Sequence, residues 1–433
     1  MRDIGRPLAL RYVQALAVSL DQARTGLHPA SVVIWAGISA ALHVGKIPPA
    51  IPLLHHELGM SLMQAGLMLS MVQFAGMVLG LLVGLGADHW GLRKCMLMGL
   101  SLMFFASCLG GLAPDATTLL VLRGVEGLGF LLVVTPAPAL IRQNVAPGEL
   151  SARMGGWGTY MSFGSALGLL LGPIVMGLWD RMTWWMAAGG VSLLAWLAVW
   201  AVVPRPLDRP ALKSPPQKLA AAAGWRDRLV RTLTTPGPWM MAFAFAVYTG
   251  QWMSVIGFLP TIYTQNQISW GMTGVLTAIV ALVNFSGNWM SGRLLQRGWS
   301  ARLTMATGYG VMGLGALGAF WDWGGWQLPF AARYACVVLF SAVGGLIPGS
   351  LFACAVRLAP SEDTVSTTVG WMQQWSATGQ FFGPLLVAWV AAAAGGWQWT
   401  WVVTLGMASV GLGLAWRIQQ ALDRKQGVGQ SHA

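Results

Sequence analysis

Long apolar runs alternate with short charged or turn-rich breaks along this chain of 433 residues. Two of the clearest runs, residues 61–87 and 95–113, hold no charged side chain in 27 and 19 positions. About 20 apolar residues are needed for a helix to cross a bilayer, where all backbone polar groups must be satisfied within the segment. The pattern therefore predicts an all-α membrane protein.

Counting these runs predicts twelve membrane-spanning helices, six on each side of one long hydrophilic stretch. The runs cover residues 31–54, 61–87, 95–113, 116–141, 153–178, 183–203, 239–264, 270–294, 300–321, 328–357, 364–391 and 397–418. The hydrophilic stretch, residues 204–238, carries five prolines before Leu219 and seven basic residues. Because prolines interrupt helices, we expect a linker there. It would separate an N-terminal half (31–203) from a C-terminal half (239–418), with a tail at 419–433.

The two halves have similar sequences at matching positions. Equivalent residues are 211 to 214 positions apart, as in Pro136 and Pro348, Gly156-Trp157 and Gly370-Trp371, and Gly172-Pro173 and Gly383-Pro384. This spacing predicts two six-helix repeats. Transporters built from such repeats place the substrate site between them, near the middle of the membrane.

Lysines and arginines give the expected orientation. With a cytoplasmic N-terminus, 22 of the 26 basic residues fall in inner segments and only Arg181 falls in an outer loop. Cytoplasmic loops of membrane proteins are enriched in these residues. We therefore expect a multi-pass protein of the inner (plasma) membrane, with both termini and the linker in the cytoplasm.

Residues 1–30 are predicted to form a cytoplasmic amphipathic arm. Apolar residues recur every four positions, at Ile4, Leu8, Tyr12, Leu16 and Leu20, among several arginines. Such a helix can lie on the membrane surface. A cleaved signal peptide is the alternative, but arginine and glutamine interrupt the apolar stretch.

Composition excludes several classes of function. Apolar residues make up 55% of the chain and charged residues 9%, and the mean hydropathy is +0.60. The net charge is +12, and the basic residues lie in short loops between the predicted spans. This distribution is the one that sets the orientation of a protein in a membrane, so we expect no nucleic-acid partner. The four cysteines show no metal-ligand spacing, and we expect neither a metal nor a cofactor. Without a nucleotide-binding loop, ATP would not drive the protein.

Residues 84–94, between the second and third predicted helices, combine glycines with charged residues: Gly84, Asp88, Gly91, Arg93 and Lys94. This turn resembles the signature of major facilitator superfamily transporters. Two further motifs are similar to those of the family, an arginine followed by glycines at Arg123, Gly127 and Gly129 and the exporters' glycine-proline motif at Gly164, Gly168, Gly172 and Pro173. The latter lacks the usual final double glycine, because Met176 precedes Gly177. The KIPPAIP segment, residues 46–52, resembles the cyanate-permease-like branch.

The resemblance implies the twelve-helix fold of that family, with two halves that rock about a central site. In the charged turn, Asp88, Arg93 and Lys94 could bond to the other half in one state and release it in the other. We therefore predict that Gly84, Asp88, Gly91, Arg93 and Lys94 form an inner gate, the alternative being an orientation signal alone. Gly164, Gly168, Gly172 and Pro173 are predicted to serve close helix packing.

Four ionisable residues fall within predicted spans: Lys46, Arg123, Glu126 and Arg333. A charge at the membrane centre costs about 2.5 to 3.5 kcal/mol, so each should face a cavity or a partner. Arg123 and Glu126 are one helical turn apart and could simply pair with each other.

His43 lies one turn before Lys46 and is either a proton carrier or a hydrogen-bonded structural group. We predict a substrate site formed by eight residues: His43, Lys46, Arg123, Tyr160, Gln251, Arg333, Gln373 and Gln374. Glu126 and His43 are the predicted proton-coupling residues.

The excess of positive charge in the predicted site favours an anionic small solute as substrate. Our first hypothesis is thus a monomeric, proton-coupled secondary transporter of a small organic or inorganic anion. The second is a proton-coupled exporter of drugs or other organic compounds, for example siderophore-like ones. A membrane-embedded enzyme is the third, and it lacks a cluster of catalytic residues. His55, His56 and Glu57 are too few for a closed metal site.

Overall fold

The computed structural model describes residues 27–146, 148–205, 224–322 and 324–430. Within these ranges the regular elements are all helices, and twelve helical segments are long and apolar enough to cross a membrane. The predicted all-α fold with twelve spans is confirmed. The predicted arm (1–30) lies almost wholly outside the described residues.

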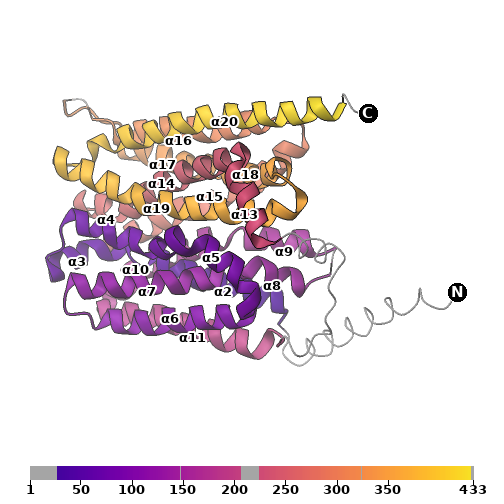
Figure 1. Cartoon of the computed structure of the whole chain (residues 1–433). Coiled ribbons are helices and arrows are strands. Elements are labelled where there is room, and N and C mark those ends of the chain that lie inside the picture. The colour runs from indigo at the N-terminus through magenta and orange to yellow at the C-terminus, as the bar shows by residue number, and fades with distance from the viewer. Residues whose placement is uncertain (1–26, 147, 206–223, 323, 431–433) are drawn as a thin grey trace.

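Six spans form the N-terminal bundle, the indigo to magenta part of Figure 1. Short breaks divide several of them, so that the helices are α2 (Pro29–Gly45), η1 (Pro48–Ala50), α3 (Ile51–Leu58), α4 (Leu62–Ser70), η2 (Met71–Gln73), α5 (Phe74–Trp90), α6 (Leu92–Gly111), α7 (Ala116–Val134), α8 (Ala137–Gln143), α9 (Leu150–Trp157), α10 (Tyr160–Leu178) and α11 (Arg181–Val202).

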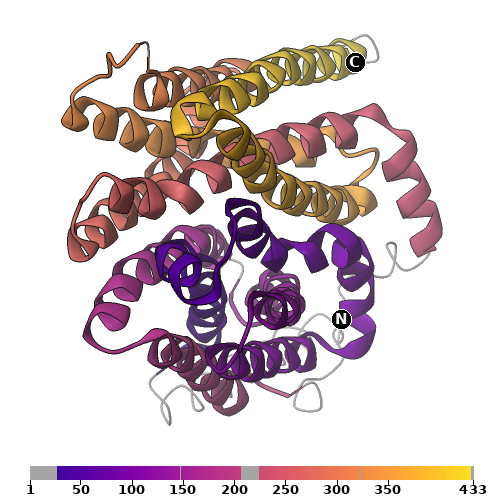
Figure 2. The same ribbon diagram turned by 90° about the vertical axis from the view of Figure 1, so that its left-hand side faces the viewer.

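The other six spans form the C-terminal bundle, which runs from rose to yellow in Figure 1. Its helices are α14 (Pro236–Gln265), α15 (Trp270–Gln296), α16 (Ala301–Phe320), α17 (Phe330–Gly344), α18 (Leu346–Leu358), η4 (Glu362–Thr364), α19 (Val365–Ala394), η5 (Trp397–Trp399) and α20 (Thr400–Gln430). The short helix α13 (Trp225–Thr234) precedes them, at the end of the stretch predicted as a linker. Figure 2 shows the two bundles side by side, viewed along their helices.

The α-helix of the first span is interrupted where the sequence removes backbone donors. Pro48 and Pro49 cannot supply N–H groups to carry α2 onward, and the 3-10 turn η1 follows. The carbonyl of Lys46 instead accepts a hydrogen bond from the indole nitrogen of Trp184, at 3.1 Å. This bond fixes the position of Lys46 relative to α11.

Glycines bring α10 against α2. A Cβ at Gly164 would lie 2.4 Å from the Ile38 carbonyl oxygen, and one at Gly168 would lie 2.5 Å from the Gly45 carbonyl carbon. One turn further, a Cβ at Gly172 would lie 2.7 Å from the ring of Pro49. The two backbones therefore pack at a distance that only glycine permits, as small residues do in membrane helix pairs.

The two halves touch mainly along two pairs of spans, and η1 and α3 of the first span also pack against α14. On one side, α10 packs against α15, with the rings of Phe163 and Phe285 6.0 Å apart. On the other, α4 and α5 pack against α19, where the Gln73 amide donates to Gln380 at 3.0 Å. These contacts must rearrange if the halves rock.

Gln374 of α19 makes two hydrogen bonds to the backbone of α5 across this second contact. Its amide oxygen accepts from the backbone N–H of Leu81, at 3.1 Å, and its amide nitrogen donates to the carbonyl of Met77, at 2.8 Å. Those two backbone groups are four residues apart, the pair that a regular helix joins to each other. The side chain thus binds the backbone of α5 from the opposite half.

A disulfide across this contact is expected to stop transport. A Cβ on Gly76 would lie 3.0 Å from the Cβ of Ala377, within reach of a disulfide after a small adjustment. We expect Gly76→Cys/Ala377→Cys, in a chain whose four cysteines are replaced by serine, to lose transport on oxidation and regain it on reduction. Each single cysteine variant is the control, and transport that continues in the oxidised pair would show that this contact stays closed throughout the cycle.

Candidate functional site

Four ionisable side chains gather inside the N-terminal bundle, between α2, α6, α7 and α11. His43 lies on α2 and Lys46 is the residue that caps its C-terminal end, whereas Arg123 and Glu126 lie on α7. Each pair is three residues apart and therefore lies on one face of its helix. All four side chains are buried, with at most 2% exposed. We call these four residues the charged cluster.

Glu126 is the centre of the charged cluster. One carboxylate oxygen forms an ion pair with the Lys46 ammonium, and the other accepts from Arg123 Nη1 at 2.7 Å. The ring of His43 places Nδ1 3.3 Å from the first oxygen. A single carboxylate thus serves two cations and one histidine.

Serines complete this network. The Lys46 ammonium donates to Ser107 at 3.0 Å, and the Ser107 hydroxyl donates to the carbonyl of Trp185 at 2.8 Å. On the other side, His43 Nε2 lies 2.8 Å from the Ser192 hydroxyl. A neutral His43 that donates from Nδ1 to Glu126 accepts at Nε2 from Ser192. The Lys46 ammonium also lies 5.0 Å from the centre of the Trp185 ring, a cation–π distance.

The charges of the cluster do not cancel. Lys46 and Arg123 contribute two positive charges and Glu126 one negative charge, which leaves one positive charge when His43 is neutral. A buried charge is costly without a partner, and Glu126 is the only described acidic side chain paired with these cations. A proton arriving on Glu126 would raise the charge of the cluster to two and break both ion pairs.

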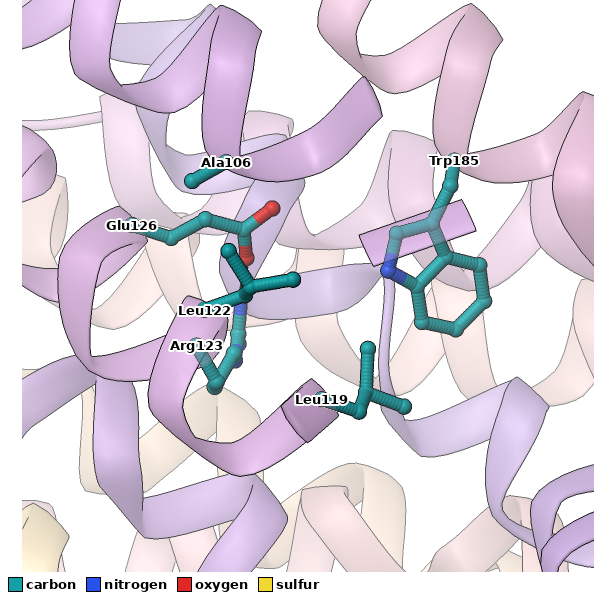
Figure 3. Close-up of a pocket in the computed structure, with 6 residues that line it drawn as sticks. All are labelled: Ala106, Leu119, Leu122, Arg123, Glu126 and Trp185. Atoms are coloured by element: carbon teal, nitrogen blue, oxygen red, sulfur yellow. Dashed lines mark hydrogen bonds and ion pairs between the residues drawn. The ribbon is translucent and has the colours of Figure 1, made fainter. Parts of the chain in front are cut away.

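A small pocket adjoins the cluster. It is lined by Ala106, Leu119, Leu122, Arg123, Glu126 and Trp185 (Figure 3), and it is too narrow to hold a water molecule. These residues belong to α6, α7 and α11, so the pocket lies within the N-terminal half.

Arg333 is not part of the cluster. It lies near the start of α17, where its guanidinium donates to the Ala319 carbonyl at 2.8 Å and to Gln327 at 2.6 Å. Both partners are neutral and belong to the end of α16 and the following loop.

The polar residues predicted for substrate binding are spread over both halves. The Tyr160 ring stacks on Trp157 at the start of α10, with their centres 4.3 Å apart. Gln251 of α14 is fully buried, and its amide donates to the carbonyl of Val247 at 3.1 Å. Gln373 is exposed on α19, whereas its neighbour Gln374 binds α5.

The predicted gate residues lie where α5 turns into α6. Gly91 adopts a φ of 91°, a left-handed conformation that glycine accepts without strain. Arg93 donates to the carbonyls of Val203 and Trp200, at 2.8 and 2.7 Å, and so holds the end of α11 in the same half. Gly84 and Asp88 belong to α5, the side chain of Asp88 lying outside the described part, and Lys94 is exposed.

Sequence reasoning missed several partners of the charged cluster, above all Ser107, Ser192 and Trp185. A single serine within an apolar run carries no signal of its own, because many such serines bond only to their own helix. It also missed Gln380, the cross-half partner of Gln73. An intramembrane amide pattern could have suggested Gln380, since it lies about two helical turns beyond Gln373 and Gln374 on the same span.

The buried ion pair of Arg123 and Glu126 belongs to the N-terminal repeat alone. Pro136 and Pro348 mark equivalent positions 212 residues apart, and the positions 212 residues after Arg123 and Glu126 are Ala335 and Val338. The C-terminal half therefore has no counterpart of this ion pair at the equivalent place.

The fold and the buried charges together define a membrane transporter built from two repeats. The sequence profile of the Major Facilitator Superfamily matches residues 33–377, and the chain belongs to that family. The predicted family is confirmed. The protein is accordingly a multi-pass membrane transporter for small molecules and not an enzyme.

Relatives with similar sequences bear names that differ in the compounds they mention. The chain is 23% identical to the cyanate transport protein CynX of Escherichia coli over 265 residues, 59% of this chain and 64% of that protein. It is 30% identical to the puromycin resistance protein pur8 of Streptomyces alboniger over 233 residues, 50% of this chain and 46% of that one. These two matches thus span less than two thirds of each relative. The multidrug efflux protein YfmO of Bacillus subtilis is 21% identical over 85% of this chain and 87% of its own.

Solved transporters share the fold. A bacterial homologue of the human lysosomal transporter Spinster, in an inward-facing and unoccupied conformation, superposes with a TM-score of 0.73 at 14% identity and covers 92% of this chain and 98% of its own. A D-xylose–proton symporter superposes with a TM-score of 0.70 at 15% identity, over 90% and 97% of the two chains.

Proposed function

We propose that this protein is a secondary active transporter that moves a small anion and a proton together by alternating access. The observation that carries the proposal is the buried carboxylate of Glu126, shared by Lys46, Arg123 and His43. One proton on this group changes the charge and the bonding of the whole cluster. Glu126 is therefore the proposed proton carrier, with His43 as its relay.

The charge balance supports an anion as the partner of the proton. When Glu126 is protonated, the Lys46 ammonium loses its ion pair and keeps only neutral partners. Lys46 lies two residues before η1, which packs against α14 of the other half. Its free charge would then stand close to the junction of the halves, where an anion can neutralise it. Proton and anion each strengthen the binding of the other, as linkage requires.

A proton-coupled exporter of drugs is the second candidate function. The names of two relatives, a puromycin resistance protein and a multidrug efflux protein, favour it. In that case a cation or neutral compound would compete with the proton for Glu126, so that drug and proton would move in opposite directions.

Transport into proteoliposomes separates the two functions. We expect labelled cyanate, the solute named for one relative, or another small monovalent anion of a test panel to accumulate when the side of addition is acidic. Labelled puromycin should show no proton-dependent movement. Puromycin exchange against protons without anion uptake would favour the exporter instead.

The orientation of the chain is the second part of this proposal. Figure 1 places α9, α13 and the C-terminal end of α20 on the same side of the molecule, and the positive charge of the sequence favours a cytoplasmic side for them. A reporter active only in the cytoplasm should be active when fused after residue 225 and silent after residue 323. The reverse pattern would invert the proposed topology, with both termini and the linker outside.

A further inference from the structure

We infer that Ser192 is a positioning residue of the proton-coupling site, because its hydroxyl lets the ring of His43 gain and lose a proton without moving. The inference rests on the proposed proton transfer at Glu126 and gives a specific role to α11, the helix that carries Ser192. Ser39 of α2 supports Ser192 in this role.

The first support is the position of Ser192 between two side chains of α2. Its hydroxyl oxygen lies 2.8 Å from Nε2 of His43 and 3.3 Å from the hydroxyl oxygen of Ser39. His43 and Ser39 are four residues apart and therefore lie on one face of α2. All three side chains are buried, with at most 3% exposed. The ring of His43 thus has Ser192 at Nε2 and Glu126, at 3.3 Å, at Nδ1.

The second support is that a hydroxyl can donate one hydrogen bond and accept another at the same time. While Glu126 is ionised, Nδ1–H of His43 donates to the carboxylate, Nε2 accepts from Ser192, and Ser192 accepts from Ser39. An arriving proton binds Nε2, and Nδ1 then keeps its hydrogen or passes it to Glu126. Ser192 now accepts from Nε2–H and donates to Ser39. One proton has been gained, and each hydroxyl bond remains with its direction reversed.

The third support is that α11 is fixed beside the cluster. The indole nitrogen of Trp184 donates to the carbonyl of Lys46 at 3.1 Å. A Cβ at Gly189, one turn before Ser192, would lie 3.0 Å from Sγ of Cys108 on α6, so the two helices pack closely there. Ser192 is therefore held in place beside the imidazole ring.

The surrounding charges do not depend on Ser192. Three charged groups act on His43, namely Lys46, Arg123 and Glu126. The helices packed against α2 around the ring add two further titratable side chains, Cys108 of α6, which faces α11, and Tyr160 of α10, which stacks on Trp157. Because a serine does not titrate, its replacement changes a hydrogen bond of the ring and leaves these charges in place.

The test is nitrogen NMR of the full-length protein in lipid bilayers, with isotope-labelled histidine. The signals lost in His43→Gln identify those of His43. In the wild type we expect Nδ1 alone to carry a hydrogen at alkaline pH and Nε2 to become protonated on acidification. In Ser192→Ala this protonation should need a pH lower by about half a unit or more, because a buried N–H without an acceptor costs more than an unused lone pair. Ser192→Thr retains the hydroxyl and should restore the wild-type midpoint.

Two further variants separate this role from the loss of any buried hydroxyl. Ser350→Ala removes a hydroxyl that donates to the Leu346 carbonyl of its own helix, and it should titrate like the wild type. Ser39→Ala removes the partner of Ser192 and should lower the midpoint by a smaller amount.

Three results would overturn the inference. They are an unchanged midpoint in Ser192→Ala, a wild-type ring with its hydrogen on Nε2 at alkaline pH, and a wild-type Nε2 that stays unprotonated down to the pH at which the protein unfolds. This measurement involves no transport, whereas accumulation by Glu126→Gln tests the proposed function. Loss of accumulation in Glu126→Gln together with an unchanged midpoint in Ser192→Ala would therefore remove this inference alone.

Discussion

Glu126→Gln is expected to abolish proton-driven accumulation of the substrate while retaining exchange of the substrate across the membrane. The glutamine has the shape of a protonated glutamate but cannot release a proton. The transporter could then bind and carry its solute in both directions without using the pH gradient. Accumulation driven by a pH gradient and exchange at equal concentrations, both in proteoliposomes, are the two measurements.

The same substitution should lower stability. Lys46 and Arg123 would lose their only described acidic partner, and removing one member of a buried ion pair costs about 3–5 kcal/mol. Glu57→Gln is the matched control, because Glu57 pairs with Arg181 at a more exposed position. Exposed pairs contribute about 0–1 kcal/mol, so this variant should transport and unfold like the wild type. If Glu126→Gln still accumulated substrate along a pH gradient, Glu126 would not be the proton carrier.

Lys46→Gln is expected to raise the KM for the anion by about 10- to 150-fold, the equivalent of one hydrogen bond to a charged group. Lys46→Arg should recover only part of the affinity, because a planar guanidinium places its charge and donors differently from a compact ammonium. Initial uptake rates over a range of anion concentrations give KM for each variant.

Arg333→Gln is the control for this second prediction. Arg333 bonds to a carbonyl and an amide at the end of its helix, away from Glu126, so its loss should leave KM unchanged. An unchanged KM in Lys46→Gln, or a substrate that proves to be a cation, would favour the exporter. If Arg333→Gln raised KM as much as Lys46→Gln, both cations would act on the anion only through the overall electrostatic field of the protein.

Much of the architecture follows from local chemistry that the chain carries without its partners. Apolar runs such as residues 61–87 and 95–113 are long enough to require a helix in a membrane, whatever packs beside them. Proline pairs such as Pro48 and Pro49 mark where a span must break. Lys46, Arg123 and Glu126 could be selected as a functional group because a charge in an apolar run is costly.

The tertiary structure decided how these residues combine, since contacts across helices depend on rotation and depth that a linear pattern does not contain. It joined Lys46 to Glu126, although a pair between Arg123 and Glu126 was the only one expected from spacing. It placed Arg333 with neutral partners at a helix end, and it bonded Gln374, a predicted substrate contact, to the backbone of α5. In each case the sequence determined the residue type and the span, and the packing of neighbouring helices determined the partner.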